Sequence, residues 1–247
     1  LQKLLELERR GELPSLAVPV LLDLALLAEA IDLLERLLKD RDLTGIVDFR
    51  LAAIGDAAVA WRRNALLEQI HAQASESFRR GYPALMAEVL IGIGKPEEAR
   101  AEVARAQAKD DLRARQLIRL ARAEFRLGED EAAARTLERI AMARDLDEDA
   151  IRALAGLYLS AERTRAGLRA FERLRRERPS PAAEAGWARM AAREGRDSEL
   201  LDWLQANTVV DRDLLADIVF LSQPGLAPRS ALAAAERLYR EHPDREA

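Results

Sequence analysis

"LGEDEAAARTLERI", residues 127–140, repeats the pattern of "IGKPEEARAEVARA", residues 93–106. When the two stretches are aligned, Gly94 falls on Gly128, Ala99 on Ala133 and Val103 on Leu137. Small residues around them recur 34 or 33 residues apart, at Ala87, Ala121, Ala155 and Ala188. Self-similarity with a fixed period of this length is typical of a stacked array of helical repeats.

The composition indicates an all-α protein. The 247 residues are 49% hydrophobic but only 4% aromatic, and the apolar residues are mostly Leu and Ala, accompanied by many Glu and Arg. These residue types are strong helix formers, whereas strand-favouring residues are sparse. Charged residues make up 33% of the chain, which fits helices with large solvated faces.

Charge and cysteine content exclude several classes of function. The net charge of −4 gives no overall basic field for nucleic acid, so we expect no nucleic-acid partner. The absence of cysteine excludes disulfides, thiolate catalysis and cysteine-ligated metal. The apolar stretch Leu16–Leu22 is far shorter than a membrane span of about 20 residues. Because the chain begins with Leu, we expect a fragment, and membrane contact only through segments outside it.

The spacing has a packing explanation. Each unit is expected to hold two antiparallel helices, which approach closely where small residues lie at their crossing. Larger residues such as Leu137 and Phe171 then fill the space to the next unit, because one helix pair cannot bury its apolar face alone. Gly94 is expected to end a first helix, and Pro96 suits the first turn of the second helix.

The unit resembles the tetratricopeptide repeat, a helix–turn–helix repeat of 34 residues. "LAGLYLSAERTRAGLRAFERLRRERP", residues 154–179, follows its pattern through Ala155, Tyr158, Phe171 and Pro179, and departs from it at Glu162 and Gly167. The resemblance implies an all-α superhelical solenoid of about six tandem units.

The expected organisation has three parts. Irregular repeat-like units occupy 1–79, well-matched units occupy 80–213, and a partial unit occupies 212–247. The well-matched part divides into 80–113, 114–147, 148–180 and 181–213. In the first part we expect a turn near Gly55, a long second helix running on towards Phe78, and another second helix at Ala28–Leu38. Residues 1–14 are interpreted as the tail of a preceding unit.

The sequence holds few groups that could perform catalysis. Glu68 and His71 lie one helical turn apart, a pair that di-iron bundles use twice, but here it occurs once. His71 is therefore interpreted as a surface or interface residue, and His242 as structural. There is no phosphate-binding glycine loop and no serine beside a base. We expect a protein that is not an enzyme, with no catalytic residue, metal or cofactor.

The densest basic run is Arg173–Pro179. Cations at the end of a helix interact favourably with its negative end, so we interpret the run as the last turn of a second helix. A patch that binds anionic lipid or nucleic acid is the alternative.

By resemblance, the first helices line a concave groove with the second, fifth, ninth and thirteenth residues of each unit. The same positions hold Ile118 and two acidic residues, Glu88 and Asp149. They also hold six arginines, which outnumber the acidic residues: Arg115, Arg122, Arg126, Arg152, Arg189 and Arg193. Arginine forms bidentate contacts with carboxylates, so we predict a groove that prefers an acidic peptide, an acidic protein surface or an anionic polymer. Alternatively, the arginines pair with residues such as Glu124 or Glu194, and the groove is neutral.

These features predict a non-catalytic scaffold for protein–protein interaction, or a structural segment of a larger assembly that can also pair with a second copy through its ends. The repeats are similar in style to the periplasmic repeat regions of bacterial exopolysaccharide export proteins of the Pel, cellulose and poly-N-acetylglucosamine type. That similarity implies partner recruitment for secretion of a biofilm polysaccharide in the periplasm. A cytoplasmic adaptor or sensor that binds an acidic peptide or regulatory protein is the alternative.

Overall fold

The described residues of the computed structural model are 5–7, 10, 17–39, 43, 46–207, 209–222 and 229–241, and they form helices without any strand. The chain divides into two compact units. Unit 1 comprises Leu1–Leu112 and Arg122–Glu129, and unit 2 comprises Arg113–Ala121 and Asp130–Ala247. The all-α prediction is therefore confirmed for the described part of the chain.

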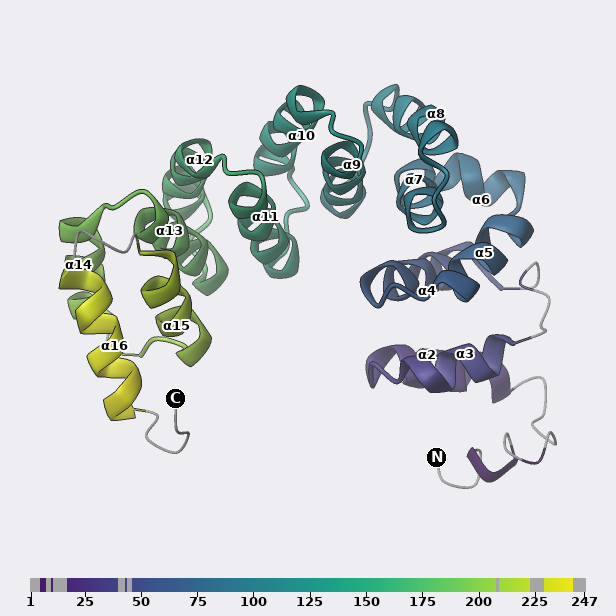
Figure 1. Cartoon of the computed structure of the whole chain (residues 1–247), viewed down its shortest axis with the longest axis horizontal. Helices are drawn as coiled ribbons and strands as arrows, with labels where there is room; N and C mark the ends of the chain where they lie inside the picture. Colours follow the sequence, from purple (N-terminus) through teal and green to yellow (C-terminus); the bar gives the residue numbers. More distant parts are fainter. Residues whose placement is uncertain are drawn as a thin grey trace. The chain divides into compact units, whose positions relative to one another are not determined.

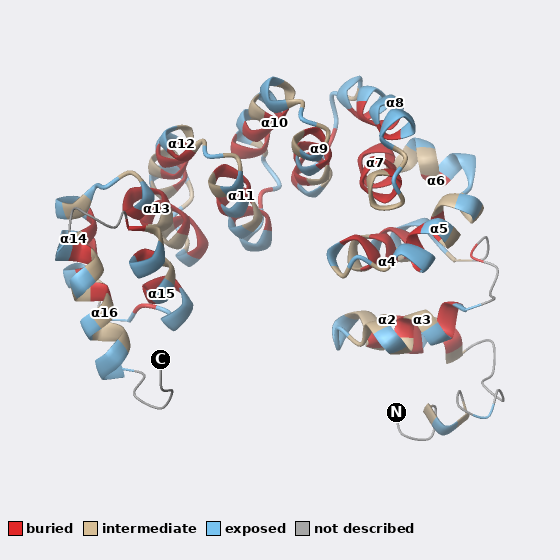
Figure 2. Ribbon diagram, in the orientation of Figure 1, coloured by how far each residue is buried: buried red, intermediate tan, exposed pale blue. Residues whose placement is uncertain are grey.

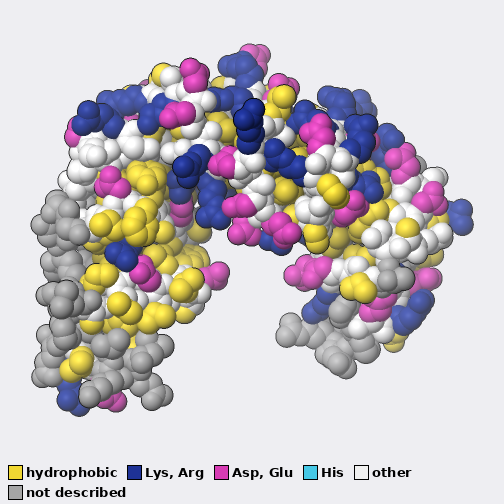
Figure 3. Space-filling model, turned by 180° about the vertical axis from the view of Figure 1, so that it is seen from behind, with side chains coloured by type: hydrophobic (Ala, Val, Ile, Leu, Met, Phe, Trp, Pro, Cys, Tyr) yellow, Lys and Arg dark blue, Asp and Glu magenta, His cyan; other side chains and the backbone are white. Residues whose placement is uncertain are grey.

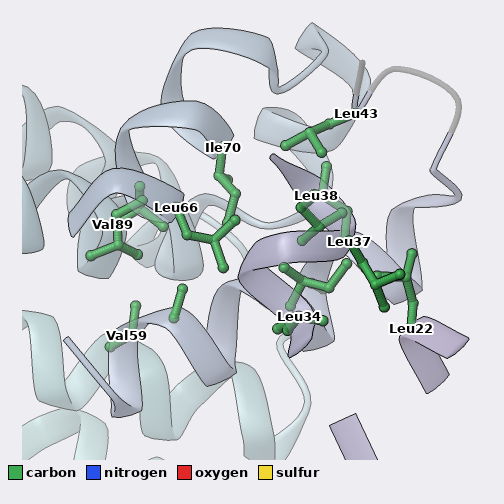
Figure 4. Packing of buried hydrophobic residues seen from close by; sticks show 14 of the residues in the cluster. Leu22, Leu34, Leu37, Leu38, Leu43, Val59, Leu66, Ile70 and Val89 are labelled. Carbon is green, nitrogen blue, oxygen red and sulfur yellow. The ribbon is translucent and has the colours of Figure 1, made fainter. Parts of the chain in front are cut away.

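Unit 1 contains α2 (Val18–Leu27), α3 (Ile31–Leu38), α4 (Asp48–Ala60), α5 (Asn64–Gln73), α6 (Glu76–Gly81), α7 (Pro83–Gly92) and α8 (Pro96–Gln107). Helix α4 packs against α2, α5 and α7, while α7 also contacts α5, α6 and α8. The core of the unit consists largely of leucine side chains, including Leu34, Leu37 and Leu38, with Ile70 and Val89 (Figure 4).

Helix α9 (Ala114–Arg126) contributes residues to both units, and α10 (Asp130–Met142) to α16 (Arg229–Glu241) belong to unit 2. The helices between them are α11 (Glu148–Ser160), α12 (Thr164–Glu177), α13 (Pro181–Arg193), α14 (Asp197–Ala206) and α15 (Arg212–Leu221). Contacts follow a regular order: α11 touches α12 and α13, α13 touches α14 and α15, and α14 and α15 touch α16. Figure 1 shows these helices as successive hairpins.

Most of the hairpins share one turn. Six residues between paired helices have a positive φ, and they lie 32 to 34 residues apart: Glu29, Arg62, Gly94, Gly128, Glu162 and Gly195. After each, the next N–H donates to the carbonyl oxygen five residues earlier in the chain, as in Glu129 to Glu124 at 2.9 Å and Arg163 to Tyr158 at 3.0 Å. This is the Schellman motif, which satisfies carbonyl groups at a helix end.

Two N-terminal predictions are wrong. Gly55 lies inside α4, where an added Cβ atom would be 3.0 Å from the Leu85 side chain of α7, and the turn instead uses Arg62. The second helix of that hairpin does not run on towards Phe78. It ends at Gln73, and α6 begins after Ser75, whose hydroxyl accepts a hydrogen bond from the Phe78 N–H at 3.0 Å. The helix predicted at Ala28–Leu38 is α3, and residues 1–14 lie mostly outside the described residues.

Neighbouring hairpins are also joined at the ends of their second helices. Gln69 of α5 donates to the Leu38 carbonyl at the end of α3, and Arg173 of α12 donates to the Ala141 carbonyl of α10, both at 3.0 Å. Arg237 of α16 donates to the carbonyls of Leu204 in the last turn of α14 and of Asn207 just after it. Figure 2 shows buried residues on the side of the helices that meets neighbouring helices and exposed residues on the opposite side.

Candidate functional site

The structure divides the six predicted arginines into two groups of three. The paired arginines, Arg115, Arg152 and Arg189, each form an ion pair within unit 2. Arg115 is 3.0 Å from Asp147, Arg152 is 2.7 Å from Asp149 and 2.9 Å from Glu148, and Arg189 is 2.7 Å from Asp217 of α15. Because these cations are already matched by carboxylates, an incoming anion would have to compete for them.

Asp147 illustrates how an ion pair is built into the hairpin. Its carboxylate accepts a hydrogen bond from the Ala150 N–H at 2.8 Å and so caps the start of α11. That backbone hydrogen bond, together with the bond from Arg115, lowers the pKa of Asp147, against a smaller opposing effect of burial. Arg115 is therefore bound by a residue that also caps the start of a helix.

The free arginines are Arg122 and Arg126, on the part of α9 that belongs to unit 1, and Arg193 at the end of α13. All three side chains are exposed. No ion pair or hydrogen bond joins them to any other residue in the described part of the chain. Arg122 and Arg126 lie one helical turn apart, so both guanidinium groups lie on one face of α9.

Two other predicted positions on this face are buried. Glu88 is 1% exposed, because α7 is covered by α4, α5, α6 and α8 and keeps little free surface. Ile118 is 5% exposed, since it follows the buried Leu117 on the apolar side of α9. The next residue, Arg119, is more exposed than Ile118. It lies at helical spacing from Arg115, Arg122 and Arg126, and that spacing could have identified it in the sequence.

The carboxylates proposed to neutralise the arginines have different partners. Glu124 is fully buried and accepts a hydrogen bond from Gln107 at 2.8 Å. Glu194 binds Arg165 at 3.1 Å and the Thr164 hydroxyl. The paired arginines therefore bind other carboxylates than the two predicted: Asp147, Glu148, Asp149 and Asp217.

The basic run at 173–178 is largely engaged within unit 2. Arg173 and Arg178 donate to carbonyl oxygens at the end of α10. Arg175 binds Glu184 at 2.9 Å and lies over the Trp187 ring, 4.1 Å from its centroid. These contacts agree with the interpretation of the run as the end of a second helix.

The described ranges hold no group of three or more His, Asp or Glu residues placed to bind a metal ion. Glu68 is exposed, while His71 lies beside Arg79 and Lys95, whose positive charges oppose metal binding. His242 lies outside the described residues. A helix both long and apolar enough to span a lipid bilayer is also missing from those ranges.

Comparison with protein-family models, curated proteins and solved structures finds no match for this chain. Its architecture is compatible with a helical repeat protein.

Proposed function

We propose that this chain is a non-catalytic helical-repeat scaffold of the tetratricopeptide type, and that it binds an acidic segment of a protein partner. The single observation that carries the proposal is the division of the predicted arginines. Arg122, Arg126 and Arg193 have no ion-pair or hydrogen-bond partner among the described residues, although carboxylates outnumber basic residues in the chain, 43 to 39.

The charge arrangement supports an acidic partner. Leaving Arg122 and Arg126 one turn apart on α9 carries a small cost, because like charges at this spacing repel. A carboxylate-bearing segment would relieve that repulsion and form charge-assisted hydrogen bonds with both guanidinium groups. Figure 3 shows Lys and Arg side chains interspersed with Asp and Glu on the surface, so the charge balance at each arginine depends on its own neighbours.

The recurring turn supports the scaffold part of the proposal. Positive-φ residues spaced 32 to 34 residues apart place successive helix pairs in equivalent local geometry, as a tandem repeat requires. Recruitment of a partner for exopolysaccharide export is the setting that the style of the repeats suggests.

The test is selection from a library of random short peptides, followed by affinity measurements on the winners. The variant Arg122→Ser/Arg126→Ser/Arg193→Ser removes the free arginines. The matched control Arg115→Ser/Arg152→Ser/Arg189→Ser removes the same charge from the paired arginines. Circular dichroism establishes that both variants fold.

We expect the wild type to select peptides rich in Asp and Glu. The first variant should bind them at least about tenfold more weakly, and the control should lose much less. Equal losses in the two variants would show that only net charge matters. Selection of peptides without acidic enrichment would refute an acidic partner.

A further inference from the structure

His71 lies where three elements of unit 1 meet. It is on α5, and its ring faces α6 on one side and the start of α8 on the other. The Nε2 atom is 3.1 Å from Lys95 Nζ, and the Nδ1 atom is 3.5 Å from Arg79 Nη2. Lys95 directly follows the turn residue Gly94, so the imidazole touches both the α7–α8 hairpin and the α6 connection.

The ring cannot satisfy both cations. A neutral imidazole has one nitrogen that accepts a hydrogen bond and one that carries a proton. If Nε2 accepts from Lys95, the ring proton lies on Nδ1 and faces Arg79. In the other tautomer Nδ1 can accept from Arg79, but the proton on Nε2 then faces Lys95. A second proton on the ring would turn both nitrogens into donors that face cations.

The surrounding bonds hold these cations in place. Arg79 donates to the carbonyl oxygens of His71 and Ala74 at the end of α5. Lys95 forms an ion pair with Glu98 at 2.9 Å. Arg79 can move away from the ring only by giving up these carbonyl contacts, whereas Lys95 is held more weakly, by an exposed ion pair.

The other charged groups near His71 offer limited compensation. Glu98 Oε2 is 3.9 Å from His71 Nε2, and its side chain is half exposed. Glu68, one turn earlier on α5, is exposed. Helices α4 and α7, which also pack on α5, contribute apolar residues such as Ile54 and Leu85 to the core beside Ile70.

We propose that His71 is an acid-sensitive latch: when its ring takes a second proton, the contacts that join α5, α6 and the start of α8 loosen. The repulsion then acts on Arg79 and Lys95 together, and the local opening separates the α4–α5 hairpin from the α7–α8 hairpin. The geometry confines this response to unit 1.

The direction of the pH dependence follows from linkage. Burial lowers the pKa of His71, and Lys95 and Arg79 lower it further, against an opposing effect of Glu98. In the unfolded chain the pKa returns to about 6.5. The stabilisation is therefore present above that pH and is lost as the pH falls through the lower value of the folded protein.

Hydrogen exchange of backbone amides tests the latch. Exchange in α5, α6 and the first turn of α8 is measured at about pH 5 and about pH 7.5 and corrected for its intrinsic pH dependence. We expect several-fold faster opening at the lower pH in the wild type. His71→Gln keeps a polar side chain without a second proton, and it should abolish most of the change. His242→Gln removes the other histidine and should behave like the wild type.

The ring itself supplies a second readout. Nuclear magnetic resonance titration of His71 should give a pKa below the unfolded value, which Lys95→Gln raises and Glu98→Gln lowers. Circular dichroism at neutral pH establishes that each variant is folded. The latch is refuted if His71 titrates at or above the ordinary histidine value, or if His71→Gln opens with acid as the wild type does.

Discussion

At the hairpin turns, a charged residue can stand where the next repeat has glycine. Glu162 has a φ of 54°, compared with 76° at Gly128 and 70° at Gly195, and all three turns close with the same backbone hydrogen bond. At the helix crossings of α12 and α13, no such exchange is possible. A Cβ atom at Gly186 would lie 2.1 Å from the Phe171 ring.

The difference shows that the two kinds of position are constrained by different physics. A turn needs one backbone conformation, which glycine adopts freely and other residues adopt at a modest cost. A Cβ at Gly128 would meet nothing within 4 Å. A crossing needs a residue without a side chain, because the neighbouring Phe171 is fully buried and packs edge-on against Tyr158. Sequence can therefore vary at the turns while the crossings stay small.

The largest effect is expected at a crossing. Gly186→Ala forces its new methyl group into the ring of Phe171, so we expect unfolding in urea to show a loss of about 2 kcal/mol or more. In a chain that already carries Phe171→Leu, adding Gly186→Ala should cost less stability than it does in the wild type, because the smaller side chain leaves room for the methyl group. If Gly186→Ala is as stable as the wild type, the crossing tolerates substitution and the contrast with the turns disappears.

A smaller loss is expected at a turn. Gly128→Ala places a Cβ in the left-handed region without any clash, so we expect a loss of about 1 kcal/mol in the same experiment. Gly156→Ala is the control, because Gly156 lies in α11 with free space around it, and alanine there should stabilise the helix by up to about 1 kcal/mol. A similar response at both glycines would mean that φ does not govern the turn.

The smallest effect should have the opposite sign. Glu162 is exposed, and its backbone has a positive φ that glycine adopts without strain. Glu162→Gly also makes the unfolded chain more flexible, so we expect a net gain in stability of only about 0.5 kcal/mol. Thermal unfolding measures it, with Glu138→Gly in the middle of α10 as a destabilising control. A loss at Glu162 would show that its side chain contributes to the turn.

The same contrast explains what the sequence could predict. Glycine readily adopts the positive φ of these turns, so Gly94, Gly128 and Gly195 indicate in the sequence where helices between 83 and 206 end. Arg62 adopts the same conformation without any such signal, so the turn was misplaced at Gly55, a glycine that serves close helix packing.

The candidate binding surface was predictable only in part. The resemblance to the tetratricopeptide repeat predicted outward positions for Arg122, Arg126 and Arg193, and all three side chains are exposed in the structure. It could not reveal that Arg189 meets Asp217, because that ion pair depends on how α13 packs against α15. Nor could it reveal the burial of Glu88, which results from the number of helices around α7.

Side chains that reach back to the preceding second helix give the contacts between neighbouring hairpins a direction. Gln69, Arg173 and Arg237 each donate to carbonyl groups that lie earlier in the chain. At these three places the carbonyl groups at the end of the earlier helix depend on a donor side chain from the following hairpin. Loss of a later hairpin within a unit should therefore weaken the end of the helix before it, because a backbone carbonyl there loses the side chain that satisfied it.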